Sequence, residues 1–71
     1  MTNEEIEYAL LDAGIEVQKF NNGIHWRLYD LLGQEYDWWP SKGTFKVVRS
    51  REKKRILYSA EEVIDFITKK P

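Results

Sequence analysis

The chain contains no cysteine and a single histidine. The absence of cysteine excludes a disulfide framework, a thiolate metal site and a thiol nucleophile. Zinc sites normally take several histidine or cysteine ligands, so a single histidine argues against a metal centre. The sequence also has no glycine-rich phosphate loop and no Gly-x-Ser-x-Gly nucleophile motif. We therefore expect no metal ion or other cofactor.

Long apolar runs are also missing. No stretch approaches the roughly 18 consecutive apolar residues that a membrane-spanning helix needs. Residues 1–14 are acidic and amphipathic, whereas a secretory signal begins with basic residues followed by an apolar core. These patterns predict a cytoplasmic protein that does not use a membrane as a partner.

Aromatic residues are plentiful, with three Trp, four Tyr and three Phe in 71 residues. A chain of this length forms one small domain, residues 1–71, and such a domain hides only a modest share of its surface. Aromatic side chains bury a large area each, so they can build a sufficient core in a short chain.

The charges are divided unevenly along the chain. Residues 1–40 contain two basic and eight acidic side chains, whereas residues 41–71 contain nine basic and four acidic ones. The overall net charge of −1 therefore hides −6 in the first part and +5 in the second. Either the basic part forms a binding face, or the two parts attract each other within the fold.

Two amphipathic stretches predict helices at the two ends of the chain. Thr2 and Glu5 fit a capping box, apolar residues recur at helical spacing over Asn3–Ala13, and Gly14 suits a left-handed helix end. A second capping box begins at Ser59. The buried stripe of the helix that follows it is Ala60, Val63, Ile64 and Ile67.

Between the helices the pattern changes to strands. Asn22-Gly23 is a strong signal for a type I′ hairpin turn, and Leu32-Gly33 is a candidate for a second two-residue turn. The predicted strands are Ile15–Phe20, Ile24–Asp30, Glu35–Trp39 and Thr44–Val48. We expect an α+β fold of a helix, a three- to four-stranded antiparallel meander and a helix, with both helices on one sheet face.

The other sheet face is the first candidate site. If Leu32-Gly33 forms a two-residue turn, Arg27 lies opposite Trp38 and Tyr29 lies opposite Tyr36, beside His25. Such a face could stack on nucleobases or form the centre of a protein interface. Alternatively, another element covers the face, or Trp38 merely packs on Arg27 as a cross-strand pair.

A basic run is the second candidate, because five of the seven residues 49–55 are Lys or Arg. These cations could neutralise phosphate groups, or they could simply form a solvated loop that keeps the protein soluble. The predicted binding residues on the face and in the run are Arg27, Tyr29, Tyr36, Trp38, Arg49, Arg51, Lys53, Lys54 and Arg55.

His25 is the only side chain whose ordinary pKa lies near neutrality, so it could serve as a general acid or base. Asp30, Glu35 and Asp37 are near enough in sequence to orient it. The alternative is an ordinary histidine on a strand.

Residues 36–45, YDWWPSKGTF, resemble a motif in small bacteriophage proteins of unassigned function. Those proteins carry an aromatic-Trp/Tyr-Pro-x-x-Gly-x-Trp/Phe pattern after a short strand with a histidine, followed by a basic stretch and a helix. The resemblance covers about residues 22–68. It implies a phage or prophage accessory protein and does not imply an activity.

Residues 10–17, LLDAGIEV, and 22–27, NGIHWR, are similar to the start of HicA-type toxins. That family places a helix, a glycine, a strand and a Gly-Ser-His motif on a fold like the double-stranded RNA-binding domain, which implies RNA cleavage with His25 as the catalytic residue. This chain differs by having Ile24 at the small hydroxyl position and Pro40-Ser41-Lys42 where the family has Pro-x-His.

Together these patterns predict a non-catalytic, phage-type accessory protein, monomeric or weakly dimeric, that binds a host protein or nucleic acid. The alternative is a HicA-like ribonuclease that uses His25.

Overall fold

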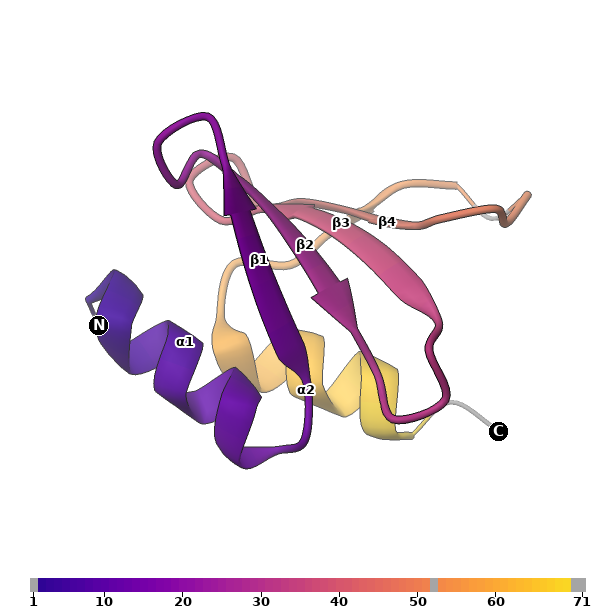
Figure 1. Ribbon diagram of the computed structural model, residues 1–71. Coiled ribbons are helices and arrows are strands. Elements are labelled where there is room, and N and C mark those ends of the chain that lie inside the picture. Colours follow the sequence, from indigo (N-terminus) through magenta and orange to yellow (C-terminus); the bar gives the residue numbers. More distant parts are fainter. Residues whose placement is uncertain (1, 52, 70–71) are drawn as a thin grey trace.

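The computed structural model describes residues 2–51 and 53–69. Seven elements follow one another along the chain: α1 (Asn3–Asp12), β1 (Glu16–Phe20), β2 (His25–Tyr29), β3 (Glu35–Trp39), β4 (Thr44–Val47), β5 (Arg55–Ile56) and α2 (Ala60–Thr68). All neighbouring strands are antiparallel, and their order in the sheet equals their order in the sequence. Both helices lie together on one face of the sheet (Figure 1). The predicted α+β architecture is confirmed, with one short additional strand, β5.

The helix ends form as their sequences predict. The Thr2 hydroxyl accepts a hydrogen bond from the Glu5 amide at 3.2 Å, and the Ser59 hydroxyl accepts one from the Glu62 amide at 3.1 Å. At the end of α1, Gly14 has a φ of 85°, which glycine adopts without steric cost. The helix terminates there in a Schellman motif.

The core lies between the sheet and the two helices. One row of paired, buried side chains crosses β2, β3 and β4 as Trp26, Trp38 and Phe45, and a second row crosses them as Leu28, Tyr36 and Val47. The two buried indole N–H groups are satisfied, because Trp26 Nε1 donates to the Gly23 carbonyl at 2.7 Å and Trp38 Nε1 donates to the Leu57 carbonyl at 2.9 Å. The second bond joins β3 to the segment that enters α2.

The first hairpin has a longer turn than its sequence predicts. Phe20 pairs with His25, so four residues connect β1 and β2 instead of a two-residue type I′ turn. Asn21, Asn22 and Gly23 all have positive φ values, of 53°, 58° and 86°. Asparagine and glycine tolerate this conformation, so the predicted hairpin position is confirmed and the predicted type I′ turn is wrong.

The second hairpin corrects the predicted register by one residue. Tyr29 pairs with Glu35, so the connection has five residues instead of the predicted Leu32-Gly33 turn. Asp30 holds this loop: its Oδ1 accepts hydrogen bonds from the amides of Leu32 and Gln34, each at 2.9 Å. Its Oδ2 accepts one from the Tyr36 hydroxyl, also at 2.9 Å.

This shift changes which side chains share a face. Arg27 lies opposite Asp37 rather than Trp38, and Tyr36 lies opposite Leu28 rather than Tyr29. Tyr36 and Trp38 are therefore fully buried against the helices, and the prediction that they lie on the exposed face was wrong. Successive side chains of a β-strand point to opposite faces of the sheet. A shift of one residue in the pairing register therefore moves every side chain of the strand to the other face.

The order of strands in the sheet separates the acidic and basic parts of the chain in space. Because strand order follows sequence order, the acidic first part of the chain supplies β1 to β3, and the basic second part supplies β4, β5 and the segment between them. Residues 48–51, which follow β4, extend beyond the sheet (Figure 1).

Candidate functional site

We use the name open face for the side of the sheet that points away from the helices. Strand alternation places on it the residues between the buried core positions. Along β2, β3 and β4 these residues are His25, Arg27, Tyr29, Glu35, Asp37, Trp39, Thr44 and Lys46. Most are half-buried by one another, so the open face is an ordered layer of side chains rather than a fringe of independent ones.

Asp37 is the polar centre of this layer. Its Oδ1 is 2.8 Å from His25 Nε2 and accepts a hydrogen bond from Arg27 Nε at 2.5 Å. Arg27 also reaches Glu35 through Nη1, with a distance of 3.4 Å to Oε2. Partial burial works to raise the pKa of Asp37, but the hydrogen bonds from His25 and Arg27 and the Arg27 charge together lower it below its ordinary value. The same hydrogen bond to Asp37 raises the pKa of Arg27.

An aromatic row runs beside Asp37. The His25 and Trp39 rings are stacked, with their centroids 4.3 Å apart and their planes 6° from parallel. Phe20 continues the row on the other side of His25, at 5.5 Å between centroids and a tilt of 40°. Asp37 holds the imidazole edge while Trp39 covers its face, so the orientation of His25 is fixed by two independent contacts.

Next to this row the sheet is hollowed. A surface pocket of about 390 Å³ is lined by Trp39, Lys42, Thr44, Lys46 and Lys54. We call it the Trp39 pocket. Its three lysines come from the turn after β3, from β4 and from the approach to β5. None of the three forms an ion pair with a carboxylate in the described part of the chain.

The turn that carries Lys42 depends on a glycine. Gly43 has a φ of 76°, and a Cβ there would lie 2.6 Å from the Tyr58 ring. The Gly43 carbonyl also accepts a hydrogen bond from the Leu57 amide at 2.7 Å. The segment that enters α2 therefore packs directly on this turn and fixes the rim of the pocket.

The predicted site residues are only partly brought together. Arg27 and Tyr29 lie on the open face, but both are engaged: Arg27 by the two carboxylates and Tyr29 by a hydrogen bond from its hydroxyl to Gln18 Oε1 at 3.1 Å. Of the three carboxylates expected near His25, Asp37 contacts it, whereas Asp30 holds the loop after β2 instead.

The basic run divides between two sides of the sheet. Arg49, Arg51, Lys53 and Lys54 are exposed, and Lys54 reaches the Trp39 pocket. Arg55 pairs with Phe45, so it lies on the helix side, where its guanidinium stands over the Phe66 ring at 4.5 Å. Arg55 is exposed on the side of the sheet opposite the open face, and its predicted role in binding stays a prediction.

Sequence reasoning missed Trp39, Lys42 and Lys46. A signal for Trp39 existed in β3, where Glu35 and Asp37 alternate with aromatic residues. Charged side chains at every second position of a strand indicate the face that meets solvent. Trp39 lies two residues after Asp37, so the same alternation places it on that face. The predicted two-residue turn at Leu32-Gly33 instead placed Trp38 on the open face, which is wrong.

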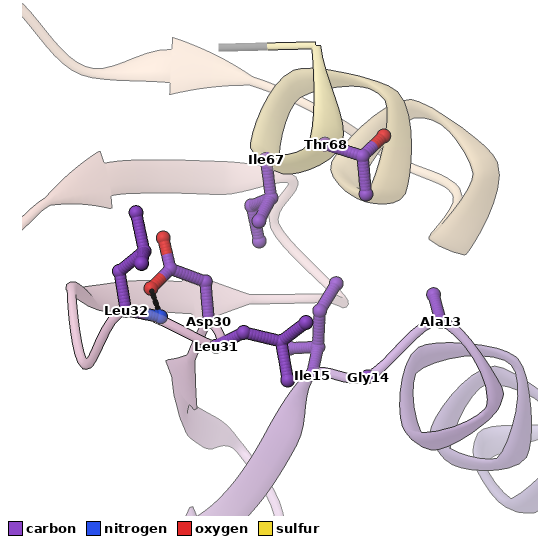
Figure 2. Close-up of a pocket in the computed structure, with 8 residues that line it drawn as sticks. All are labelled: Ala13, Gly14, Ile15, Asp30, Leu31, Leu32, Ile67 and Thr68. Carbon is purple, nitrogen blue, oxygen red and sulfur yellow. Dashed lines mark hydrogen bonds between the residues drawn. The ribbon is translucent and has the colours of Figure 1, made fainter. Parts of the chain in front are cut away.

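A second, apolar pocket of about 290 Å³ lies at the opposite end of the sheet, between the loop after β2 and the end of α2. Figure 2 shows Leu31 and Leu32 on the loop, facing Ile67 and Thr68 of α2. The two leucines are 86% and 94% exposed, the highest values among the large apolar side chains described. The Asp30 carboxylate beside them already accepts hydrogen bonds within the loop.

The described residues show neither a metal site nor a membrane-spanning helix. Across residues 2–51 and 53–69, no group of three or more His, Asp or Glu side chains could hold a metal ion. No helix within the same ranges is long and apolar enough to cross a membrane.

Comparisons with known proteins give no family. No model of a protein family matches the chain, and neither the curated proteins nor the solved structures contain a significant match. The resemblances to bacteriophage proteins and to HicA-type toxins therefore stay predictions.

Proposed function

We propose that this protein is a non-catalytic binding module for nucleic acid, and that the ligand lies on the open face over β3, β4 and the approach to β5. The observation that supports this is the stacked pair His25–Trp39 beside three lysines that have no described acidic partner. Aromatic rings provide stacking surfaces for bases, and lysines neutralise phosphates.

Nucleic acid fits this surface better than a protein does. The centres of protein interfaces are enriched in Trp, Tyr and Arg and depleted of Lys. Here the cations around Trp39 are all lysines. The one arginine of the open face, Arg27, is already bound to Asp37 and Glu35. Arg49, Arg51 and Lys53, in the connection between β4 and β5, are also exposed.

The proposal is tested by an NMR amide-shift titration of the labelled protein with single-stranded RNA, single-stranded DNA and duplexes at low and moderate salt. We expect shifts around Trp39, Lys46 and Lys54 that weaken as salt rises. Lys54→Glu should reduce binding, whereas Lys69→Glu, an equal change of charge after the end of α2, should have little effect. An absence of shifts with every nucleic acid would contradict the proposal.

A second candidate function is RNA cleavage with His25, as the HicA likeness implies. The observation in its favour is the 2.8 Å contact between His25 and Asp37, because a carboxylate often orients a catalytic imidazole. His25→Phe keeps a ring to stack on Trp39 and removes the proton-transfer group. If the protein cleaves RNA, this variant should retain binding and lose cleavage in a labelled-RNA assay. A wild-type protein that binds RNA without shortening it would exclude this function.

A phage-type accessory role agrees with a module of this size, and it remains our proposal for the biological setting. It rests on residues 36–45, which the structure divides between the core and the Trp39 pocket.

A further inference from the structure

We infer that the Trp39 pocket takes one unpaired base of a single strand, which stacks on Trp39 while the flanking phosphates contact Lys42, Lys46 and Lys54. This inference rests on the proposed function and narrows it from nucleic acid in general to single-stranded nucleic acid. It is carried by the geometry of the aromatic row, the size of the pocket and the distribution of charge on the open face.

Trp39 belongs both to the aromatic row and to the pocket. His25 covers one face of its indole, at 4.3 Å and 6° from parallel, and Trp39 is half-buried and lines the pocket. A base placed there would continue the stack that begins at Phe20 and His25. In a duplex both faces of a base are already stacked on neighbours, so only an unpaired base can enter such a position.

The platform is fixed before any ligand arrives. Asp37 holds His25 through a 2.8 Å contact, and His25 in turn holds one face of Trp39. Gly43 and Tyr58 pack together and fix the turn that carries Lys42. A preformed stacking surface loses little conformational entropy on binding, which favours affinity in a small site.

The pocket has room for a single nucleotide rather than for a helix. Its volume of about 390 Å³ falls at the small end of the range for small-molecule sites, roughly 300–1,000 Å³. Its lysines stand on three different segments, the turn after β3, β4 and the approach to β5, so more than one phosphate of a bound strand can meet a cation. Thr44, between them, offers a hydroxyl that can donate or accept a hydrogen bond.

Charge limits the path of the strand. At the far end of the open face, Glu16, Tyr29 and Glu35 are neighbours across β1, β2 and β3. Glu16 is exposed there and Glu35 is paired with Arg27 at 3.4 Å, so the described residues at this end offer phosphates no available cation, whereas three lysines line the end near Trp39. The bound single strand of nucleic acid therefore crosses the sheet over β3, β4 and β5 and does not extend toward β1.

The experiment is a fluorescence-anisotropy titration of labelled ten-nucleotide oligomers, dT10 and U10, and of a ten-base-pair duplex, at several salt concentrations. We expect the single strands to bind more tightly than the duplex. Trp39→Ala should weaken single-strand binding about 5- to 150-fold, the range found when a stacking residue is removed. Trp39→Phe should restore part of the affinity because it keeps an aromatic face.

Charge variants provide an independent measurement at an exposed position. Each lysine that contacts a phosphate contributes about 0.7 to the slope of log affinity against log salt for a single strand. Lys54→Glu should therefore lower that slope, while Lys69→Glu leaves it unchanged. Leu32→Ser, at the apolar loop far from the pocket, should bind as the wild type does. Far-UV circular dichroism shows whether each variant is folded.

The outcomes separate the inference from the proposed function. If the duplex binds as tightly as the single strands, or if folded Trp39→Ala binds single strands like the wild type, the stacking inference is wrong and the proposed function stands. If poly-glutamate displaces the oligomers at equal charge concentration, the surface is a general anion site and the inference is also wrong. If no nucleic acid binds, both fail.

Discussion

Trp38 and Trp39 are adjacent in sequence but lie on opposite faces of β3, and this difference predicts opposite consequences of mutation. Trp38 is fully buried, packs edge-to-face on Trp26 at 5.7 Å between centroids, and donates a hydrogen bond to the Leu57 carbonyl. Trp39 is half-buried on the open face and stacks on His25. Substitution of Trp38 should therefore affect stability, and substitution of Trp39 should mainly affect binding.

The expected cost at Trp38 can be worked out from these contacts. Truncation of a buried tryptophan to alanine costs about 3–5 kcal/mol, and the lost hydrogen bond adds about 1 kcal/mol. A domain of 71 residues has a free energy of unfolding of roughly 4–11 kcal/mol. Trp38→Ala should thus cost about 4–6 kcal/mol, which removes most of the stability of a domain at the low end of that range and about half of it at the high end. Trp38→Phe keeps an aromatic ring and should cost about 1.5–3 kcal/mol.

At Trp39 the expected cost is smaller. Trp39→Ala exposes one face of His25 and loses an aromatic pair worth about 0.5–1.5 kcal/mol beyond its burial, so we expect a total near 1–2 kcal/mol. The assay is urea unfolding followed by far-UV circular dichroism, because tryptophan fluorescence itself changes in these variants. A neutral Trp38→Phe, or a Trp39→Ala protein as destabilised as Trp38→Ala, would refute the register on which the candidate site depends.

Three further predictions concern the residues that shape the loops and the open face. The lowered pKa of Asp37 in the folded state means that its stabilising contribution is present above its unfolded pKa of about 3.9 and is lost as pH falls through the folded value. Asp37→Asn should therefore flatten the acid side of a plot of unfolding free energy against pH, and an unchanged acid limb would contradict this. Asp30→Ala should lower the free energy of unfolding in urea by about 2–3 kcal/mol, because the buried Tyr36 hydroxyl and two loop amides lose the carboxylate that they contact. A cost below the error of the measurement would refute the role of Asp30 in the loop. Gly43→Ala should lower the free energy of unfolding by about 2–3 kcal/mol, because of the positive φ of Gly43 and the close contact of a Cβ with the Tyr58 ring. In a double-mutant cycle, a Tyr58→Ala background should remove the part of this cost that comes from the contact. A cost unaffected by that background would show that φ alone is responsible.

Much of the fold could be predicted because its signals are local. The capping boxes at Thr2 and Ser59 and the glycine after α1 mark helix ends through hydrogen bonds made within a few residues. The predicted bounds of β3 agree with the structure, since alternation over five residues is enough to identify a strand. Short-range patterns of this kind need no knowledge of distant partners.

The candidate site was harder to predict because it depends on pairing between strands. The loop after β2 was expected to have two residues and has five, and a carboxylate, Asp30, holds it in that form. Loop length sets the register, and the register decides which of two neighbouring tryptophans meets solvent. The prediction of Trp38 as a surface anchor was wrong for this reason, although the alternation within β3 already favoured Trp39.

By itself, the sequence determined the two helices and the first four strands, the positions of the helix caps and the separation of charge along the chain, because each of these depends on neighbours in sequence or on composition. The tertiary structure decided which side chains share the open face, that Asp37 joins His25 to Arg27, and that Lys42, Lys46 and Lys54 line one pocket with Trp39. Those lysines belong to three separate segments, and only the antiparallel pairing of β3, β4 and β5 brings them together. A site made by pairing therefore becomes visible only once the register is known.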